Sequence, residues 1–479
     1  MSYKTGDRKQ MTFLPPTIDE YIGHEDPVRV YDAFVEAIDL QELGIPVQPY
    51  KAGAQEYHPK SMLKLFTYGY SYGKRSSRKL ERACHHNVSF QRLMSGLKPD
   101  YRTIARFRSE YKGAIKNVLK QCVRLCIKLD LIEGNTLFID GSKFRANASI
   151  NNTWTDKRCE ARLEKISKNI DRLVDEAERM DKQEEEKESL VRVKEELMDQ
   201  EKLKATIQDI AKTLKETGKF SINTTDQECV KAKGRQGTHA SYNAQIAVDE
   251  KHGLIASGEA VSENNDLNQF HNQLSQASEN IGNKPREACS DSGYFSLKDV
   301  NQVPEDITVV MPTQKQAQKE NNLHPLKPFD KEQFQYDSDK DEYICPEGKR
   351  LKYVGAAFSS TRKRAYKAAG KDCRGCPHFG VCTTSRDGRR VVRMAEESLK
   401  ERLEDIYHSP QGQEVYRLRK QKVELPFGHM KRNLGAGQFL LRGKKGVDAE
   451  LSILSTCFNV ARTMTILGIP ALILKLQGM

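Results

Sequence analysis

Apolar residues recur at helical spacing through the first quarter of the chain. Between Val28 and Leu40 the apolar positions Val30, Phe34 and Ile38 repeat every four residues, the spacing of one face of an α-helix. Similar patterns continue beyond a link rich in Gly, Pro and Gln. Helices are therefore predicted over residues 28–40, 59–73, 77–86 and 99–129. Together they predict an all-helical module over residues 1–130.

A short apolar run, typical of a buried strand, follows this module and ends in an acidic residue. Residues 136–139 are apolar or β-branched, and Gly141 and Ser142 break the pattern directly after Asp140. The run therefore predicts a strand that carries the Asp140 carboxylate at its carboxyl tip. Because Asp is also common at the start of turns, a plain turn residue is the alternative for this position.

Further strands are predicted after residue 240. The runs 242–248 and 254–261 flank the turn sequence D-E-K-H-G and predict an antiparallel hairpin. A helix is expected to follow the hairpin. The sequence C-S-D-S-G-Y-F-S then places Asp291 after another short run, with Ser and Gly behind it, as at Asp140. A buried strand at 307–312 completes the series.

Residues 157–219 differ sharply in composition from the strands on either side. Glu, Lys, Asp, Arg and Gln dominate, Pro is absent, and the apolar residues are widely spaced. This composition predicts a pair of long helices, inserted as a unit over about residues 155–220. An arm that contacts a partner or DNA and a structural spacer are the two interpretations of its role.

Composition and charge narrow the class of protein. The 479 residues carry a net charge of +12 with a pI near 9.0, which favours an anionic partner such as nucleic acid. The first ten residues lack the apolar core of a secretory signal, and eleven cysteines without framework spacing favour a reducing cytoplasm. The apolar stretch 451–476 is interrupted by Asn459, Arg462 and Pro470, which favours a buried helix over a membrane span.

A cysteine cluster lies in the otherwise polar segment 313–400. The sequences C-P-E-G and C-R-G-C-P-H-F-G-V-C contain Cys345, Cys373, Cys376 and Cys382. Because a C-x-x-C pair lets two thiolates share one ion, these four residues are candidate tetrahedral zinc ligands. His378 is a rival for the fourth position. The alternative without metal is four reduced thiols packed in a small insertion.

A third acidic residue lies in a strongly basic segment. Residues 416–445 contain nine Lys or Arg residues and one acid, Glu424. An isolated acid in such surroundings suits cation binding, while an ion pair with Arg419 or Lys420 is the structural alternative. Pro426 further predicts that Glu424 lies in the first turn of a helix or at a kink.

The order of these elements is that of an RNase H-like sheet, and three stretches resemble those of bacterial insertion-sequence DDE transposases. They are F-I-D-G-S-K at 138–143, C-S-D-S-G-Y-F-S at 289–296 and Y-R-L-R-K-Q-K-V-E-L-P-F-G-H-M-K at 416–431. The helical module, with P-K-S-M-L-K-L-F-T-Y-G-Y and P-D-Y-R-T-I-A-R-F-R, also resembles the module that precedes the catalytic domain in that family. The expected fold is α/β, with an RNase H-like mixed five-stranded sheet.

The resemblance implies a site and a reaction. Asp140, Asp291 and Glu424 would hold two Mg²⁺ ions, which Mn²⁺ can replace, for phosphoryl transfer on double-stranded DNA. The enzyme would act as an endonuclease at the terminal inverted repeats of its element and join the ends to target DNA, as a homodimer at the bacterial nucleoid. The predicted DNA contacts are Lys143, Arg145, Tyr416, Arg419, Lys431 and Arg432.

One position departs from the family pattern. Tyr416, Arg419 and Lys431 fit it, whereas Glu424 lies one residue further from Arg419 than is usual, as in a variant branch of the family. Two other functions stay open on the sequence alone. One is an RNase H-like metal-dependent DNA nuclease without strand transfer, and the other is a non-catalytic DNA-binding protein.

The segments define the expected domain boundaries. The helical DNA-binding or assembly module spans 1–130, and the first part of the catalytic core spans 131–312, with the helical insertion inside it. The Cys-rich insertion spans 313–400, and residues 401–479 carry the Glu-bearing helix and the C-terminal helices that complete the core. Basic residues of the helical module are candidate phosphate contacts, with a solvated helix face as the alternative: Lys74, Arg75, Arg78, Lys79, Arg102, Arg106 and Arg108.

Overall fold

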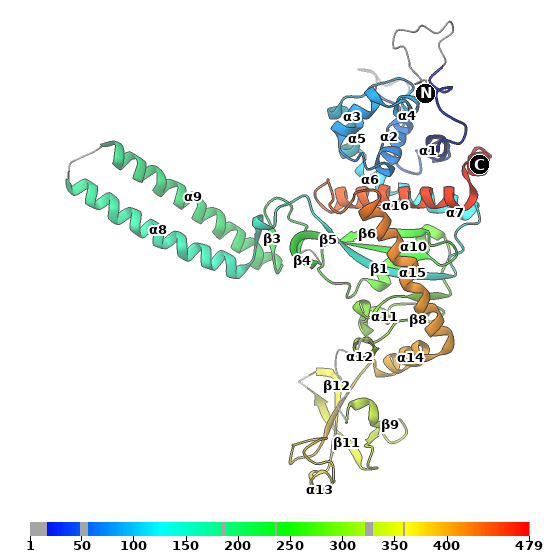
Figure 1. Ribbon diagram of the computed structural model, residues 1–479. Helices are drawn as coiled ribbons and strands as arrows, with labels where there is room; N and C mark the ends of the chain where they lie inside the picture. Colours follow the sequence, from blue (N-terminus) through cyan, green and yellow to red (C-terminus); the bar gives the residue numbers. More distant parts are fainter. Residues whose placement is uncertain are drawn as a thin grey trace, which may run out of the picture.

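The computed structural model describes residues 17–47, 56–183, 187–234, 237–320, 329–357 and 360–478. Residues 1–16 lie outside the described residues, and with them the first ten residues, which are predicted not to form a secretory signal. Figure 1 shows the N-terminal helices at one end of the molecule, above a central sheet. Two long helices project sideways from this sheet, and a smaller second sheet lies at the opposite end. The chain is therefore a mixed α/β protein with several sheets.

The central sheet, as described, has six strands. They are β1 (Thr136–Arg145), β4 (Val230–Gly234), β5 (Gly237–Asp249), β6 (Ile255–Val261), β7 (Glu287–Cys289) and β8 (Thr308–Val310). The order is β4, β5, β1, β7, β8, and β6 also pairs with β5. Strands β4, β5, β6 and β1 pair antiparallel, whereas β1, β7 and β8 pair parallel. The predicted number of five is wrong because β4, whose sequence V-K-A-K-G carries no strand signal, forms by pairing with the start of β5.

Strand β1 is longer than its apolar run predicts. The sequence places Asp140 at the tip, but the strand continues to Arg145 because β5 pairs with it along that whole length. Gly141 and Ser142 therefore lie inside a paired strand and do not end it. Since side chains alternate along a strand, Asp140, Ser142 and Phe144 all project from one face of the sheet.

Helices cover both faces of this sheet. The helices near it include α10 (Phe270–Ile281), α11 (Leu297–Val300), α12 (Gln314–Glu320), α14 (Glu397–His408) and α15 (Pro410–Arg432). Leu137 and Ile139 pack into a core with Phe270 and Leu274 of α10. The other face of β1 packs against α15, so Asp140 lies on the side that this long helix covers.

In the described residues, seven helices form the N-terminal module. They are α1 (Pro27–Glu36), α2 (Pro59–Ser71), α3 (Ser77–His86), α4 (Val88–Leu93), α5 (Tyr101–Glu110), α6 (Lys112–Lys116) and α7 (Val118–Lys128). The single long helix predicted over 99–129 is divided into α5, α6 and α7 by the non-helical residues Tyr111 and Asn117. The apolar residues of the module pack into one core that continues into the central sheet.

Helix α16 (Lys444–Leu467) is buried along most of its length and joins this module to the sheet. It packs against α2, α6 and α7 and against the outer strand β6. The amide of Asn459 bonds both N and O of Ile255, each at 2.8 Å, and Asp448 Oδ1 accepts from Ala260 N at 2.9 Å. These side chains form hydrogen bonds with backbone groups of β6 on the edge that faces away from β5.

The buried helix predicted over 451–476 is confirmed for α16, which is mostly covered by protein, but this helix ends at Leu467 and the rest of the stretch forms a second, more exposed helix. Within the described ranges, no helix taken singly has the length and apolar character needed to cross a membrane. Helices α16 and α17 (Ile469–Gln477) meet those criteria as a pair, with a bend of 111° between them.

A buried ion pair links the N-terminal module to α16. The side chain of Glu450 is fully buried, and Nη1 of Arg75 lies 2.8 Å from its Oε1. Arg75 also donates to the carbonyl oxygens of Gly435 at 2.8 Å and Gln438 at 3.0 Å. Its guanidinium is therefore occupied inside the protein, and the phosphate contact predicted for Arg75 is wrong.

The predicted pair of long helices is present as α8 (Asp156–Gln183) and α9 (Lys187–Thr217). They pack against each other and project away from the sheet (Figure 1). Their own small core contains Cys159, Ile166, Ile207 and Leu214. Strands β2 (Thr153–Trp154) and β3 (Ile222–Asn223) pair at the base and bring the two ends of the insertion together.

The Cys-rich segment contains a second sheet that its polar sequence does not predict. Its elements are β9 (Gln335–Asp337), β10 (Glu342–Ile344), β11 (Arg350–Ala357), β12 (Ser360–Ala368), α13 (Gly370–Arg374) and β13 (Arg390–Met394). The strands pair in the order β13, β12, β11, β10, β9. One face carries a small aromatic core and the other face is solvated, so the strands lack a continuous apolar run.

Arg75→Ala should destabilise the protein strongly, because it leaves the buried carboxylate of Glu450 without its charge partner. We expect a loss of about 3–5 kcal/mol in the free energy of unfolding, measured by urea titration. Lys79→Ala, an exposed change on α3, is the matched control and should stay within about 0.5 kcal/mol of the parent. Equal stabilities of the two variants would contradict the role given to Arg75.

Candidate active site

Asp140 and Asp291 lie at the same level of two adjacent parallel strands. Phe138 of β1 pairs with Cys289 of β7, and each aspartate follows its paired residue by two positions. Asp291 precedes a short 3₁₀ turn, Ser292–Tyr294, and its Oδ1 accepts a hydrogen bond of 2.8 Å from a backbone N–H of that turn. The strand pairing therefore brings the two aspartates predicted as catalytic to one edge of the central sheet.

Arg419 of α15 lies between these two carboxylates. Its Nη1 is 3.5 Å from Oδ1 of Asp140 and 4.0 Å from Oδ2 of Asp291. Burial raises the pKa of Asp140 to about 7, with Arg419 opposing the rise and Asp291 adding to it. One guanidinium therefore compensates the negative charge of the pair only in part, and the site suits a further cation.

Helix α15 presents basic side chains to the face of β1 that carries Asp140. Lys431 Nζ donates to Ser142 Oγ at 2.6 Å and lies 4.6 Å from the ring centre of Phe144. Arg419 contacts the same face at Asp140, which lies two residues before Ser142 on the strand. The structure thus brings Arg419 to the aspartate pair and Lys431 to the same face of β1.

Glu424 is exposed in the middle of α15, and this helix continues through Pro426 to Arg432. Of the two predicted positions for Glu424, a first turn or a kink, the first turn is therefore wrong. Glu424 precedes Lys431 by seven residues, or two helical turns, so both side chains leave the helix on the same side. Over the described ranges no three His, Cys, Asp or Glu side chains are grouped closely enough to hold a metal ion. Glu424 is thus not gathered with the aspartates.

Lys143 and Arg145 do not share the face of Asp140. Both are exposed residues of β1. Because they lie an odd number of positions after Asp140, alternation along the strand directs them to the other side of the sheet. Any contact of these two side chains with DNA would therefore lie on the side of β1 opposite the aspartate pair.

Tyr416 and Arg432 lie towards opposite ends of the predicted DNA-contacting segment of α15. The ring of Tyr416 packs edge-on against Tyr407 of α14, with centroids 5.1 Å apart. The guanidinium of Arg419 lies 5.6 Å from the centre of the Tyr416 ring, so this tyrosine supports the arginine between the aspartates. Arg432 is exposed at the last position of the helix.

A network that the sequence does not point out lies behind Gly141. Oδ1 of Asp266 accepts hydrogen bonds from Asn243 Nδ2 at 2.8 Å and Gln245 Nε2 at 2.7 Å. The buried hydroxyl of Tyr294 donates to Oε1 of Gln245. A Cβ atom at Gly141 would lie 2.5 Å from Nε2 of Gln245 and closer still to Oδ1 of Asp266. The glycine after Asp140 therefore makes room for this network, and that glycine is its only local signal.

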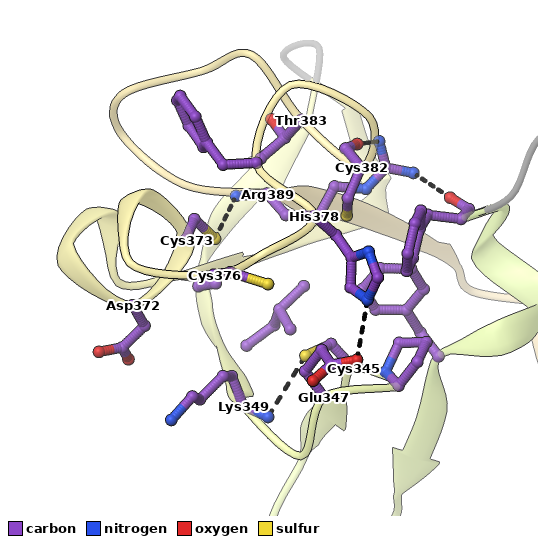
Figure 2. Close-up of a pocket in the computed structure, with 16 residues that line it drawn as sticks. Cys345, Glu347, Lys349, Asp372, Cys373, Cys376, His378, Cys382, Thr383 and Arg389 are labelled. Atoms are coloured by element: carbon purple, nitrogen blue, oxygen red, sulfur yellow. Dashed lines mark hydrogen bonds and ion pairs between the residues drawn. The ribbon is translucent and has the colours of Figure 1, made fainter.

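The four cysteines predicted as zinc ligands lie around one cavity of the small sheet, with a volume of about 30 Å³ (Figure 2). Cys345 follows β10, Cys373 lies in α13, Cys376 follows that helix, and Cys382 lies in the next turn. All four thiols are free. The structure thus brings the four residues to one place, although not to metal-binding distances.

Two transposase family models match parts of the chain. The family described as Transposase DDE domain matches residues 344–464, which include the helix that carries Glu424. The family described as Transposase domain (DUF772) matches residues 16–110, in the helical module. No curated protein and no solved structure matches the chain. The two family matches confirm the resemblance to insertion-sequence DDE transposases.

Gly141→Ala should strain the site, because its methyl group collides with the Asp266 and Gln245 side chains. We expect a loss of about 1–3 kcal/mol in the free energy of unfolding, measured by urea titration. Gly428→Ala is the matched control, since a Cβ there meets nothing within 4 Å inside helix α15. That change should stabilise the helix by up to about 1 kcal/mol. A neutral Gly141→Ala would show that the network is not tightly packed.

Proposed function

We propose that this protein is a DDE transposase that cuts DNA at the terminal inverted repeats of an insertion sequence and joins the ends to target DNA. The observation that carries the proposal is the Asp140–Asp291 pair on adjacent parallel strands, with Arg419 between the carboxylates. The transposase family matches on the helical module and on the segment with α15 support it. The proposed catalytic domain is RNase H-like.

The sheet order supports an RNase H-like core. On one side of β1, strand β5 pairs with β1 and β6 pairs with β5, all antiparallel. On the other side, β7 pairs with β1 and β8 pairs with β7, both parallel. This arrangement places the first strand in the middle of the sheet, where its side chains meet those of the later strand β7. The extra strand β4 pairs with the first residues of β5, so it does not change the order of the other strands.

The proposed metal ligands are Asp140, Asp291 and Glu424, whose oxygen atoms suit Mg²⁺ or Mn²⁺. Two such ions would activate the attacking hydroxyl or water and stabilise the leaving 3′ oxygen. The raised pKa of Asp140 fits this assignment, because a buried carboxylate needs nearby positive charge to stay ionised. Glu424 lies on the helix side that Lys431 uses to reach β1, which favours it as the third ligand.

Arg419 is proposed to bind the scissile phosphate as well as the aspartates. Its Nε is buried and has no hydrogen-bond partner within the described part of the chain. A phosphate oxygen is an acceptor that would satisfy this donor. The charged Nη1 would then stay near Asp140 and Asp291 and orient the phosphate toward them.

The proposed partner is double-stranded DNA, held along a basic surface. Lys431, Arg432 and Tyr416 of α15 are proposed to contact the strand at the aspartate pair, and Lys143 and Arg145 to contact DNA beyond it. The segment 345–393 adds thirteen Lys or Arg residues against three acids. Such surplus charge suits sequence-independent phosphate binding. A homodimer acting at the nucleoid in the bacterial cytoplasm is proposed from the family resemblance.

Asp140→Asn, Asp291→Asn and Glu424→Gln should each abolish Mg²⁺-dependent cleavage of repeat-bearing DNA while leaving DNA affinity within a few-fold of the parent. We expect losses beyond about 100-fold, since removing even an outer partner of a metal ligand costs about 10–100-fold. Glu414→Gln, an exposed change on the same helix, is the control and should keep full activity. Unchanged cleavage in any of the three variants would remove that residue from the site.

Strand transfer separates a transposase from a nuclease of the same fold. With pre-cut inverted-repeat ends and a second duplex, we expect covalent joining of the 3′-hydroxyl to the target, detected as a product of increased length on a denaturing gel. Joining should be lost in Asp140→Asn together with cleavage. Cleavage without joining would favour the nuclease, and DNA binding with neither activity would favour a non-catalytic DNA-binding protein.

A further inference from the structure

We propose that Cys345, Cys373, Cys376 and Cys382 bind one zinc ion that attaches a long loop of the small sheet to its neighbouring strands. The thiols come from three turns that converge on one cavity (Figure 2). The cavity, with a volume of about 30 Å³, has room for a small ligand such as an ion. The site is separate from the proposed transposition chemistry.

Residues 369–389 need an attachment other than a hydrophobic core. This segment, described throughout, contributes no buried apolar side chain, yet it carries three of the four cysteines. The small sheet itself has a core of six buried apolar side chains in the described ranges: Phe334, Tyr343, Leu351, Tyr366, Ala368 and Val391. Cores of this size are commonly supplemented by a metal or by disulfides. A zinc ion at the four thiols would link this loop to the turn after β10.

Two of the sulfur atoms already accept backbone hydrogen bonds. Lys349 N donates to Sγ of Cys345, and Arg389 N donates to Sγ of Cys373, both at 3.3 Å. These bonds fix the direction of each sulfur, as the outer partners of metal ligands do.

The turn that follows β10 is shaped to present Cys345. Gly348 N donates to Cys345 O at 2.8 Å, and Cys345 N donates to Lys349 O at 2.9 Å. Gly348 has a φ of 71°, a left-handed conformation that glycine adopts without strain. The C-P-E-G-K sequence therefore closes a tight turn with the sulfur of its first residue directed into the cavity (Figure 2).

Four cysteines around one cavity suit a tetrahedral zinc ion, which binds sulfur at about 2.3 Å. The described side chains are not grouped at metal-holding distances, so zinc binding would require the sulfur atoms to move closer together.

His378 lines the same cavity but is already engaged elsewhere. Its Nε2 is 3.1 Å from Oε1 of Glu347, and its ring centre is 4.7 Å from that of Phe329. Both contacts hold the imidazole beside the cavity without need of a metal. The four cysteines, not three cysteines and the histidine, are therefore the proposed ligands.

The test uses the full-length protein purified under reducing conditions from medium supplemented with zinc. Elemental analysis should find about one zinc ion per chain, released when an organomercurial titrates the thiols. After exchange into Co²⁺, the protein should show the intense thiolate-to-cobalt charge-transfer band of a four-thiolate site. Both measurements are made on the unaltered chain, so they stand even if a variant fails to fold.

Variants then assign the ligands. Cys376→Ser and Cys382→Ser should each lose most of the bound zinc and weaken the cobalt band, whereas His378→Asn should keep both. Cys159→Ala, in the helical arm, is the control and should keep a full complement of zinc. These readouts do not depend on DNA cleavage, so failure of the zinc site and failure of the proposed transposase activity are distinguishable.

Three outcomes would overturn the proposal. One is a full-length protein that carries no zinc and gives no cobalt band while its thiols are reduced. Another is a zinc content in Cys376→Ser equal to that of the parent. The third is a disulfide between two of the four cysteines in protein handled without reductant, together with the absence of bound zinc.

Discussion

The buried carboxylate of Glu450 is the constraint on which the arrangement of the chain depends. It needs a positive partner inside the protein, and Arg75 from the N-terminal module supplies it at 2.8 Å. The second oxygen of Glu450 accepts from the backbone N atoms of Leu440 and Leu441 at 2.8 and 3.0 Å. One side chain of α16 thereby ties together the helical module and the loop that follows α15. Since Asn459 joins the same helix to β6, the module, α15 and the central sheet form one unit.

The candidate site uses the two faces of β1 for different purposes. On one face, Asp140 meets Arg419 and is followed by Ser142, which holds Lys431, so α15 supplies the charged groups. On the other face, the bare backbone of Gly141 lets the Asp266 network pack behind the strand. The α15 side of β1 therefore combines acidic and basic groups, while the polar groups on the other side are hydrogen-bonded to one another. Such a division suits the proposed binding of cations and phosphates.

Both insertions leave the central sheet undisturbed because each has a core of its own. The helical arm begins and ends at the paired strands β2 and β3, so its long helices need no contact with the sheet. The small sheet follows β8 and returns through α14, which packs on α15 and β8. Residues far apart in the sequence, such as Phe138 and Cys289, can therefore pair in parallel across an intervening arm.

The sequence by itself determined the elements whose signal is local. Periodicity indicated the helices of the module and of the arm, apolar runs indicated the strands that carry Asp140 and lead to Asp291, and the motifs indicated the transposase class. Only the tertiary structure decided the length of β1, the strand β4 and the small sheet, because strand pairing depends on partners remote in the chain. It also decided that Arg75 is buried and that Arg419 lies between the aspartates. A charged residue looks the same in sequence whether it faces water or a buried carboxylate, and only packing determines which of the two it meets.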